Sequence, residues 1–215
     1  MNQPLREQVA EPLRVAAEDD AEAQAALRRN DRYLREFIEE LSICPYARLC
    51  REQGRLYRAV LLQSQPMARA VAELVLALEP QSQFEIGLLL FPSFAGPGLV
   101  GEPQAFERFV SETRNQYGKL RKPPGFFLVA FHPAMPSNLA NPDVAVRFMR
   151  RSPDPTIQLV RPEAIDSIRN PSRDREDLST TIAEVGLRTV REVGPEKLAA
   201  HLSSIHHHDR PPQKA

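Results

Sequence analysis

Hydrophobic and polar positions follow one another along this chain in blocks that predict alternating strands and helices. The most apolar block, Phe126 to Pro133, reads Phe-Phe-Leu-Val-Ala-Phe-His-Pro and predicts a buried central strand that ends at His132. A strand that is apolar on both faces must be covered on both sides, so helices are expected above and below the sheet.

The first strong helical pattern lies between Ala21 and Cys44. Its apolar positions recur at helical spacing, with Arg and Glu on the opposite face: Leu27, Leu34, Phe37, Ile38 and Leu41. Pro45 disfavours a helical conformation at Cys44 and suits the first position of a second helix, Pro45 to Gln53, which would make Cys44 its N-cap. One continuous, kinked helix is the alternative.

Strands and helices alternate along the rest of the chain. Strands are predicted at Leu56 to Leu62, Phe84 to Phe91, Phe126 to Pro133 and Thr156 to Val160. Helices are predicted at 66–80, 103–118, 162–169, 177–193 and 195–201. This order predicts an α/β fold with about four mostly parallel strands in one sheet flanked by helices, and a ferredoxin-like α+β arrangement with antiparallel strands is the alternative.

Composition and charge limit the domain organisation and the partners that the chain can have. The chain has 215 residues, 42% of them hydrophobic, which is enough for one core. We therefore expect a loose segment at 1–20, a single globular domain at 21–203 and a disordered tail with histidines at 204–215. Because 28 basic and 28 acidic residues balance, we expect neither nucleic acid nor a membrane as a partner. The oligomeric state stays open.

The cysteines and the lack of apolar runs indicate a cytoplasmic location. Cys44 and Cys50 are six positions apart in a region with helical character, a spacing that suits a disulfide poorly. No apolar run reaches the roughly 18 residues of a membrane-spanning helix. The simplest interpretation is a protein with reduced thiols in the cytoplasm.

Cys44 is the first candidate for chemistry. At a helix N-cap its thiol would face the free backbone N–H groups of Tyr46 and Ala47 and the positive end of the helix dipole, which lower a thiol pKa from about 8.5 toward neutrality. Such a thiol is a nucleophile or a metal ligand. The structural alternative is a small buried hydrophobic side chain, since free cysteine is among the most buried residue types.

His132 is the second candidate, because a general base is expected at the carboxyl end of a central strand in an α/β sheet. If the second and third strands are parallel neighbours, Phe91-Pro92 and His132-Pro133 lie at the same edge. The structural alternative is a ring that only binds a neighbouring loop carbonyl. Together, Cys44 and His132 would form the smallest unit of thiol nucleophilic catalysis.

A group of polar residues before the last predicted strand is the third candidate. It comprises Arg147, Arg150, Arg151 and Ser152. Guanidinium groups bind carboxylate or phosphate in a fork, and Ser152 would add a hydroxyl group. Asn141 could orient a substrate, although turn formation explains it equally well. A solvated basic turn is the alternative to an anion site.

A metal site is a further alternative. Cys44 and His132 would need more ligands, for which Asp143 or Asp154 would serve. The sequence has no phosphate-binding glycine loop, no Cys-x-x-Cys and no His-Glu-x-x-His, so no cofactor is expected. The consecutive histidines 206–208 of the tail do not predict a fixed coordination shell.

Three short motifs give the chain a resemblance to a known family. They are Leu41-Ser-Ile-Cys-Pro-Tyr-Ala, Phe131-His-Pro and Arg151-Ser-Pro-Asp-Pro. Between about Arg32 and Val193 the chain resembles a bacterial family classed as a domain of unknown function (DUF1415), whose members are similar in carrying Leu-Cys-Pro-Phe-Ala, Phe-His-Pro and Asn-Arg-Ser-Pro in this order. The resemblance points to Cys44, Pro45, His132, Pro133, Arg151, Ser152 and Pro153 as functional positions, and it implies no activity.

Two positions depart from the family pattern. Many relatives carry a histidine before the proline where this chain has Phe91-Pro92, and Arg150 replaces the asparagine of the last motif. If that histidine were a metal ligand in the relatives, this chain would lack it, which weakens the metal interpretation.

These residues predict a small cytosolic thiol-dependent enzyme that acts on a small anionic substrate by acyl or amide chemistry. Cys44 is the expected nucleophile and His132 the expected base. The expected substrate-binding residues are Arg147, Arg151, Ser152 and Asn141. A non-catalytic binding or regulatory domain for an anionic metabolite or peptide is one alternative, and a Cys/His metal-binding protein is another.

Overall fold

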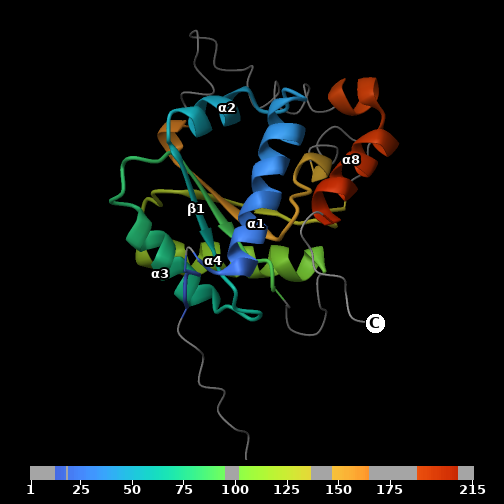
Figure 1. Cartoon of the computed structure of the whole chain (residues 1–215). Coiled ribbons are helices and arrows are strands. Elements are labelled where there is room, and N and C mark those ends of the chain that lie inside the picture. Colours follow the sequence, from blue (N-terminus) through green and yellow to red (C-terminus); the bar gives the residue numbers. More distant parts are fainter. Residues whose placement is uncertain (1–12, 18, 95–101, 137–146, 165–187, 208–215) are drawn as a thin grey trace, which may run out of the picture.

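The structure, a computed structural model, describes residues 13–17, 19–94, 102–136, 147–164 and 188–207, which form a four-stranded sheet with flanking helices (Figure 1). The strands are β1 (Leu56–Val60), β2 (Ile86–Leu90), β3 (Phe127–Phe131) and β4 (Thr156–Val160). The helices are α1 (Ala21–Arg32), the π-helix η1 (Tyr33–Glu39), α2 (Pro45–Glu52), α3 (Ala68–Leu78), α4 (Pro103–Leu120) and α8 (Pro195–His207). Shorter helical stretches lie at 147–149, 162–164 and 188–193.

The strand order across the sheet is β1-β2-β4-β3. β1 and β2 pair in parallel, whereas β4 runs antiparallel to both β2 and β3. The α/β class with one four-stranded sheet is confirmed, but the prediction of mostly parallel strands was wrong because two of the three pairings are antiparallel. The fully antiparallel alternative fails as well, at β1 and β2. Hydrophobic patterning identifies strands but does not encode which strands become neighbours.

β2, and not β3, is the fully buried strand of the sheet. Every residue from Ile86 to Leu90 is buried, with a neighbouring strand on each side. The block that contains Phe127–Phe131 was predicted to be central, yet it forms an edge strand in which Phe127 is 49% exposed. Leu128 and Ala130 are buried on one face only. The prediction from the apolar composition of this block therefore overestimated the burial of β3.

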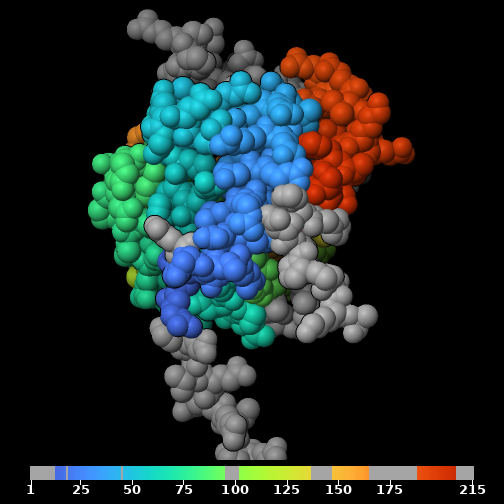
Figure 2. Space-filling view, in the orientation of Figure 1, coloured from blue at the N-terminus to red at the C-terminus, as the bar shows by residue number. Residues whose placement is uncertain are grey.

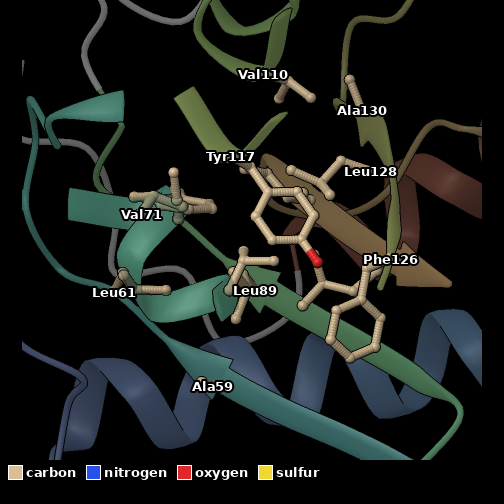
Figure 3. Close-up of a cluster of buried hydrophobic side chains, with 14 of the residues drawn as sticks. Ala59, Leu61, Val71, Leu89, Val110, Tyr117, Phe126, Leu128 and Ala130 are labelled. Atoms are coloured by element: carbon tan, nitrogen blue, oxygen red, sulfur yellow. The ribbon is translucent and has the colours of Figure 1, made fainter. Parts of the chain in front are cut away.

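Helices α3 and α4 cover one face of the sheet, and their apolar side chains form a core with those of the strands. The core draws on both helices and all four strands, including Val71, Val75, Phe106, Val110, Tyr117, Leu61, Leu89, Leu128 and Ile157. Figure 3 shows the ring of Tyr117 among Leu89, Leu128 and Phe126. Aromatic rings also interlock near the carboxyl end of β2, where Phe91 and Phe94 each contact Phe106 edge to face.

Helix α1 covers the opposite face. Small residues on its buried side, Ala23 and Ala26, pack against Ile86, Leu88 and Leu90 of β2. Helix α8 lies beside α1 and η1, as the red and blue segments of Figures 1 and 2 show. A third apolar cluster joins α8 to η1 and to the 147–149 turn, with Phe37, Phe148, Leu198, Leu202 and Ile205.

Two ends of the described chain are more ordered than the sequence indicates. The globular domain was expected to end at residue 203, but α8 continues to His207 and Ile205 is fully buried. Near the other end, in the segment expected to be loose, Val15 forms an antiparallel bridge with Leu61.

The predicted break at Pro45 is confirmed. Cys44 has an extended backbone (φ −133°, ψ 105°) and is the N-cap of α2, whose first residue is Pro45. The alternative of one continuous helix is therefore excluded. Gly54 follows the end of α2 at φ 67°, a left-handed conformation that glycine adopts without strain.

Candidate functional site

The candidate site lies where α1 and η1 meet the segment 147–155, which leads into β4. The hydroxyl of Tyr33 donates to the carbonyl of Met149 at 2.6 Å, and the backbone N–H of His132 donates to the carbonyl of Arg150 at 3.0 Å. The segment is thus bonded to η1 on one side and to the end of β3 on the other. A π-helix such as η1 is rare and is often found at functional sites.

Four buried polar residues are connected at this place, and we call them the polar junction: Arg29, Ser152, Asp154 and Thr156. Arg29 binds the carboxylate of Asp154 through Nε and Nη2, both at 3.0 Å, with the two residues 4% and 2% exposed. Ser152 and Thr156 donate their hydroxyls to the Asp154 carbonyl at 2.5 and 2.8 Å. These bonds fix the backbone of the Ser-Pro-Asp-Pro turn.

Asn30, the residue after Arg29 on α1, is also a buried polar residue. It is 1% exposed, and its Oδ1 atom has no hydrogen-bond partner in the described part of the chain. Leaving a buried acceptor unpaired costs free energy, about 1–3 kcal/mol.

Arg150 precedes the Ser-Pro-Asp-Pro turn, and the positive charges of two further arginines act on it; we call the three residues the arginine cluster: Arg114, Arg147 and Arg150. Arg114 of α4 donates to the Leu128 carbonyl at 2.9 Å, and Arg147 lies 3.5 Å from the carboxylate of Glu107, also on α4. Arg150 is partly buried. Burial lowers the pKa of Arg150, and the positive charges of Arg147 and Arg114 lower it further, whereas Glu107 raises it.

The predicted substrate-binding residues separate in the structure. Arg147 lies in the arginine cluster, but Arg151 turns away, donates to the Met135 carbonyl at 3.0 Å and places its guanidinium 4.6 Å from the centre of the Phe148 ring. Burial lowers the pKa of Arg151. Ser152 uses its hydroxyl within the polar junction, and Asn141 lies outside the described residues.

Cys44 is partly buried against the cluster that joins η1 and α8. Burial raises the pKa of its thiol, and a hydrogen bond from the Ala47 backbone N–H lowers it by less. Burial raises the pKa of the Tyr33 hydroxyl, the Arg150 guanidinium lowers it by less, and the Cys44 thiol raises it slightly. Tyr33 is thus close enough to both Cys44 and Arg150 to be affected by their charges.

His132 is 3% exposed, with its ring 6.0 Å from that of Phe106. Its Nδ1 accepts a hydrogen bond from the Ala134 backbone N–H at 3.1 Å. Burial, and then the charge of His206, lower the pKa of His132 to about 4. The interactions found for His132 and for Cys44 involve different neighbours, so their pairing stays a prediction.

Helix α8 contacts both sides of the site through two histidines. The Nε2 atom of His206 lies 3.4 Å from the Arg151 carbonyl, and that of His201 lies 3.3 Å from the Glu36 carbonyl of η1. Within the described ranges, no group of three or more His, Cys, Asp or Glu side chains is placed to hold a metal ion.

Several site residues were missed by the sequence interpretation, among them Arg29, Asn30, Tyr33 and Arg114. A signal for two of them is present in the sequence. The buried side of α1 and η1 follows the spacing of Ala23, Ala26, Asn30, Tyr33 and Phe37, so Asn30 interrupts an apolar stripe with a polar residue. Arg29 and Arg114 carry no comparable signal because their partners are distant in the sequence.

Comparison with known proteins gives a family but no activity. A family model described as a protein of unknown function (DUF1415) matches residues 25–200. Comparisons with curated proteins and with solved structures returned no match. None of the helices in the described ranges is long and apolar enough to cross a membrane.

Proposed function

We propose that this chain, which belongs to the DUF1415 family of unknown function, binds a small anionic molecule through the arginine cluster. The ligand is a carboxylate or a phosphate, and the binding groups are the guanidiniums of Arg150, Arg147 and Arg114. This proposal keeps the anion-binding part of the sequence prediction and moves it from Arg151 and Ser152 to Arg150.

The charge around Arg150 carries the proposal. Its guanidinium is partly buried and is repelled by the positive charges of Arg147 and Arg114. Among the described groups that act on it, Glu107 is the one carboxylate. A cation removed from water among like charges is costly unless an anion compensates it. A bound oxyanion would supply this compensation, and arginine forks match carboxylate and phosphate geometry.

The fixed backbone around the cluster supports the same function. The Arg150 carbonyl accepts from His132, and the preceding carbonyl accepts from Tyr33, so the main chain at Arg150 is held on two sides. A preorganised backbone lowers the entropy lost when a ligand binds. The polar junction serves this purpose by ordering the next residues of the segment.

Binding of inorganic phosphate and of acetate tests the proposal. We expect each anion to raise the melting temperature of the wild-type protein, with about 2.7 kcal/mol of stabilisation at a hundred times the dissociation constant. Arg150→Gln should abolish this rise. Arg108→Gln removes the same charge from an exposed position of α4 and should keep it. Equal responses in the three proteins would contradict the proposal.

Thiol chemistry at Cys44 is the second candidate function, favoured by its position as the N-cap of α2, where the Ala47 backbone N–H lowers the pKa of the thiol. Burial acts in the opposite direction and dominates, which is why anion binding is proposed first. Limiting iodoacetamide between pH 5 and 9, with mapping of the adducts, separates the two. A Cys44 midpoint well below about 8 would support a thiol-dependent enzyme, and an unreactive Cys44 supports a binding domain.

A further inference from the structure

We infer that His132 serves this site as a hydrogen-bond donor through Nε2–H and acts neither as a general base nor as a metal ligand. The assignment of the proton to Nε2 follows from the turn at His132 and is independent of any ligand. The donor role toward a bound anion rests on the proposed function.

The position of the proton follows from the bond at Nδ1. The backbone N–H of Ala134 points at Nδ1 at 3.1 Å, and the Met135 N–H donates to the His132 carbonyl at 3.0 Å, so the ring is part of a closed turn. A neutral imidazole has one donor and one acceptor nitrogen. Since Nδ1 is the acceptor, Nε2 carries the hydrogen.

This tautomer excludes two roles that the sequence had suggested. A general base needs a free lone pair, but the lone pair of Nδ1 is occupied by the Ala134 N–H and Nε2 is already protonated. A histidine that binds a metal through Nε2 donates its other N–H to an acceptor. At Nδ1 of His132 the neighbouring group is itself a donor, so metal binding would break the turn.

The remaining function of the ring is to donate, and a main-chain hydrogen bond joins its residue to Arg150 of the arginine cluster. His132 is bonded through its backbone to Arg150, and its ring packs on Phe106, the residue before Glu107 on α4. His206 of α8 is the titratable group that acts on the ring. The imidazole N–H would add a fourth donor to the three guanidiniums, and Glu107 is an acceptor beside them, so the donors can bind the oxygens of a phosphate anion and Glu107 can accept its remaining proton.

The tautomer can be read directly in the free protein. Nitrogen-15 NMR of the imidazole rings should show His132 as the Nε2–H form at pH 7, with no protonation until the pH approaches about 4. An Nδ1–H form, or a charged ring at pH 7, would overturn the inference whatever the protein binds.

Two substitutions separate the role of Nε2–H as a donor to the ligand from the role of Nδ1 as the acceptor in the turn. His132→Asn places an amide oxygen near the position of Nδ1, keeps the acceptor for Ala134 and removes the distal donor. His132→Gln places an amide nitrogen near the position of Nε2. We expect phosphate affinity to fall about tenfold in the Asn variant, as for the loss of one hydrogen bond to a charged group, and to stay within about threefold of wild type in the Gln variant.

The outcomes are distinct. Wild-type affinity in His132→Asn, or an equal loss in both variants when both are folded by circular dichroism, would overturn the donor role. Failure of wild-type protein to bind phosphate would refute the proposed function and the donor role with it, and the NMR result would still decide the tautomer.

Discussion

The two faces of the sheet use buried space in different ways. On the α3 and α4 face, side chains such as Leu89, Phe106 and Ile157 pack as a continuous apolar core. On the α1 side, the polar junction brings the Arg29–Asp154 ion pair and two hydroxyl groups out of water. Apolar packing tolerates volume-conserving changes, whereas buried polar sets lose much when one partner is removed. We therefore expect substitutions in the polar junction to lower stability more than volume-conserving substitutions in the apolar core.

The largest effect is expected at the buried ion pair of the polar junction. Asp154→Ala should lower the free energy of unfolding by about 3–5 kcal/mol, because the Arg29 guanidinium is left buried without its carboxylate. Urea denaturation measures the loss. The double variant Arg29→Met with Asp154→Leu should recover part of it, since apolar pairs replace buried ion pairs with little cost. A loss below about 1 kcal/mol for Asp154→Ala would contradict this view of the junction.

A somewhat smaller effect is expected from pH. The pKa of His132 is near 6.5 in the unfolded chain and about 4 in the folded one, so the unfolded state binds more protons between these values. The contribution of the neutral His132 ring to stability is fully present above pH 6.5 and is lost as the pH falls toward 4. One unit of pKa shift corresponds to about 1.4 kcal/mol, so the total is roughly 3 kcal/mol. The free energy of unfolding, taken from unfolding curves recorded across this pH range, should fall more steeply with decreasing pH in wild type than in His132→Gln.

Equal pH dependence in wild type and His132→Gln would contradict the buried neutral ring. Cys44→Ala is a control that leaves His132 in place and should keep the wild-type dependence, because Cys44 is not among the groups that shift the pKa of His132.

The smallest effect is expected in the apolar core. Ile157→Val, at a fully buried position of β4, should cost about 1 kcal/mol, because one methylene is lost from a close-packed environment. Phosphate affinity of the folded variant should be unchanged. A change of more than threefold in affinity would show that the packing of the apolar core is coupled to the ligand site.

Much of the local structure could be predicted from the sequence. Pro45 defined the start of α2 and the N-cap position of Cys44, and the strand at Thr156–Val160 was predicted with its observed bounds. Both are decided by neighbours in the sequence, through proline stereochemistry and the alternation of polar and apolar residues from Thr156 to Leu159. The family resemblance, which rested on three short motifs, is confirmed by the matching family model.

The sheet order and most of the candidate site depend on contacts between distant residues. Arg29 and Asp154 are 125 positions apart, and no local pattern marks either as the partner of the other. The hydrophobic pattern does not predict that β4 lies between β2 and β3. For this reason the third strand was predicted at the centre of the sheet, whereas it lies at the edge. Local propensity predicts elements, whereas their pairing is decided by the packing of the whole chain.

The place of β4 has a consequence for synthesis. A ribosome releases β2 and β3 before β4, the strand that joins them, so both wait with unpaired edges until residues 156–160 emerge. Unpaired strand edges bind other chains readily. Nascent chains that end before Thr156 are therefore expected to depend on chaperones, and the ligand site, built around the entry to β4, would be among the last parts of the protein to take shape.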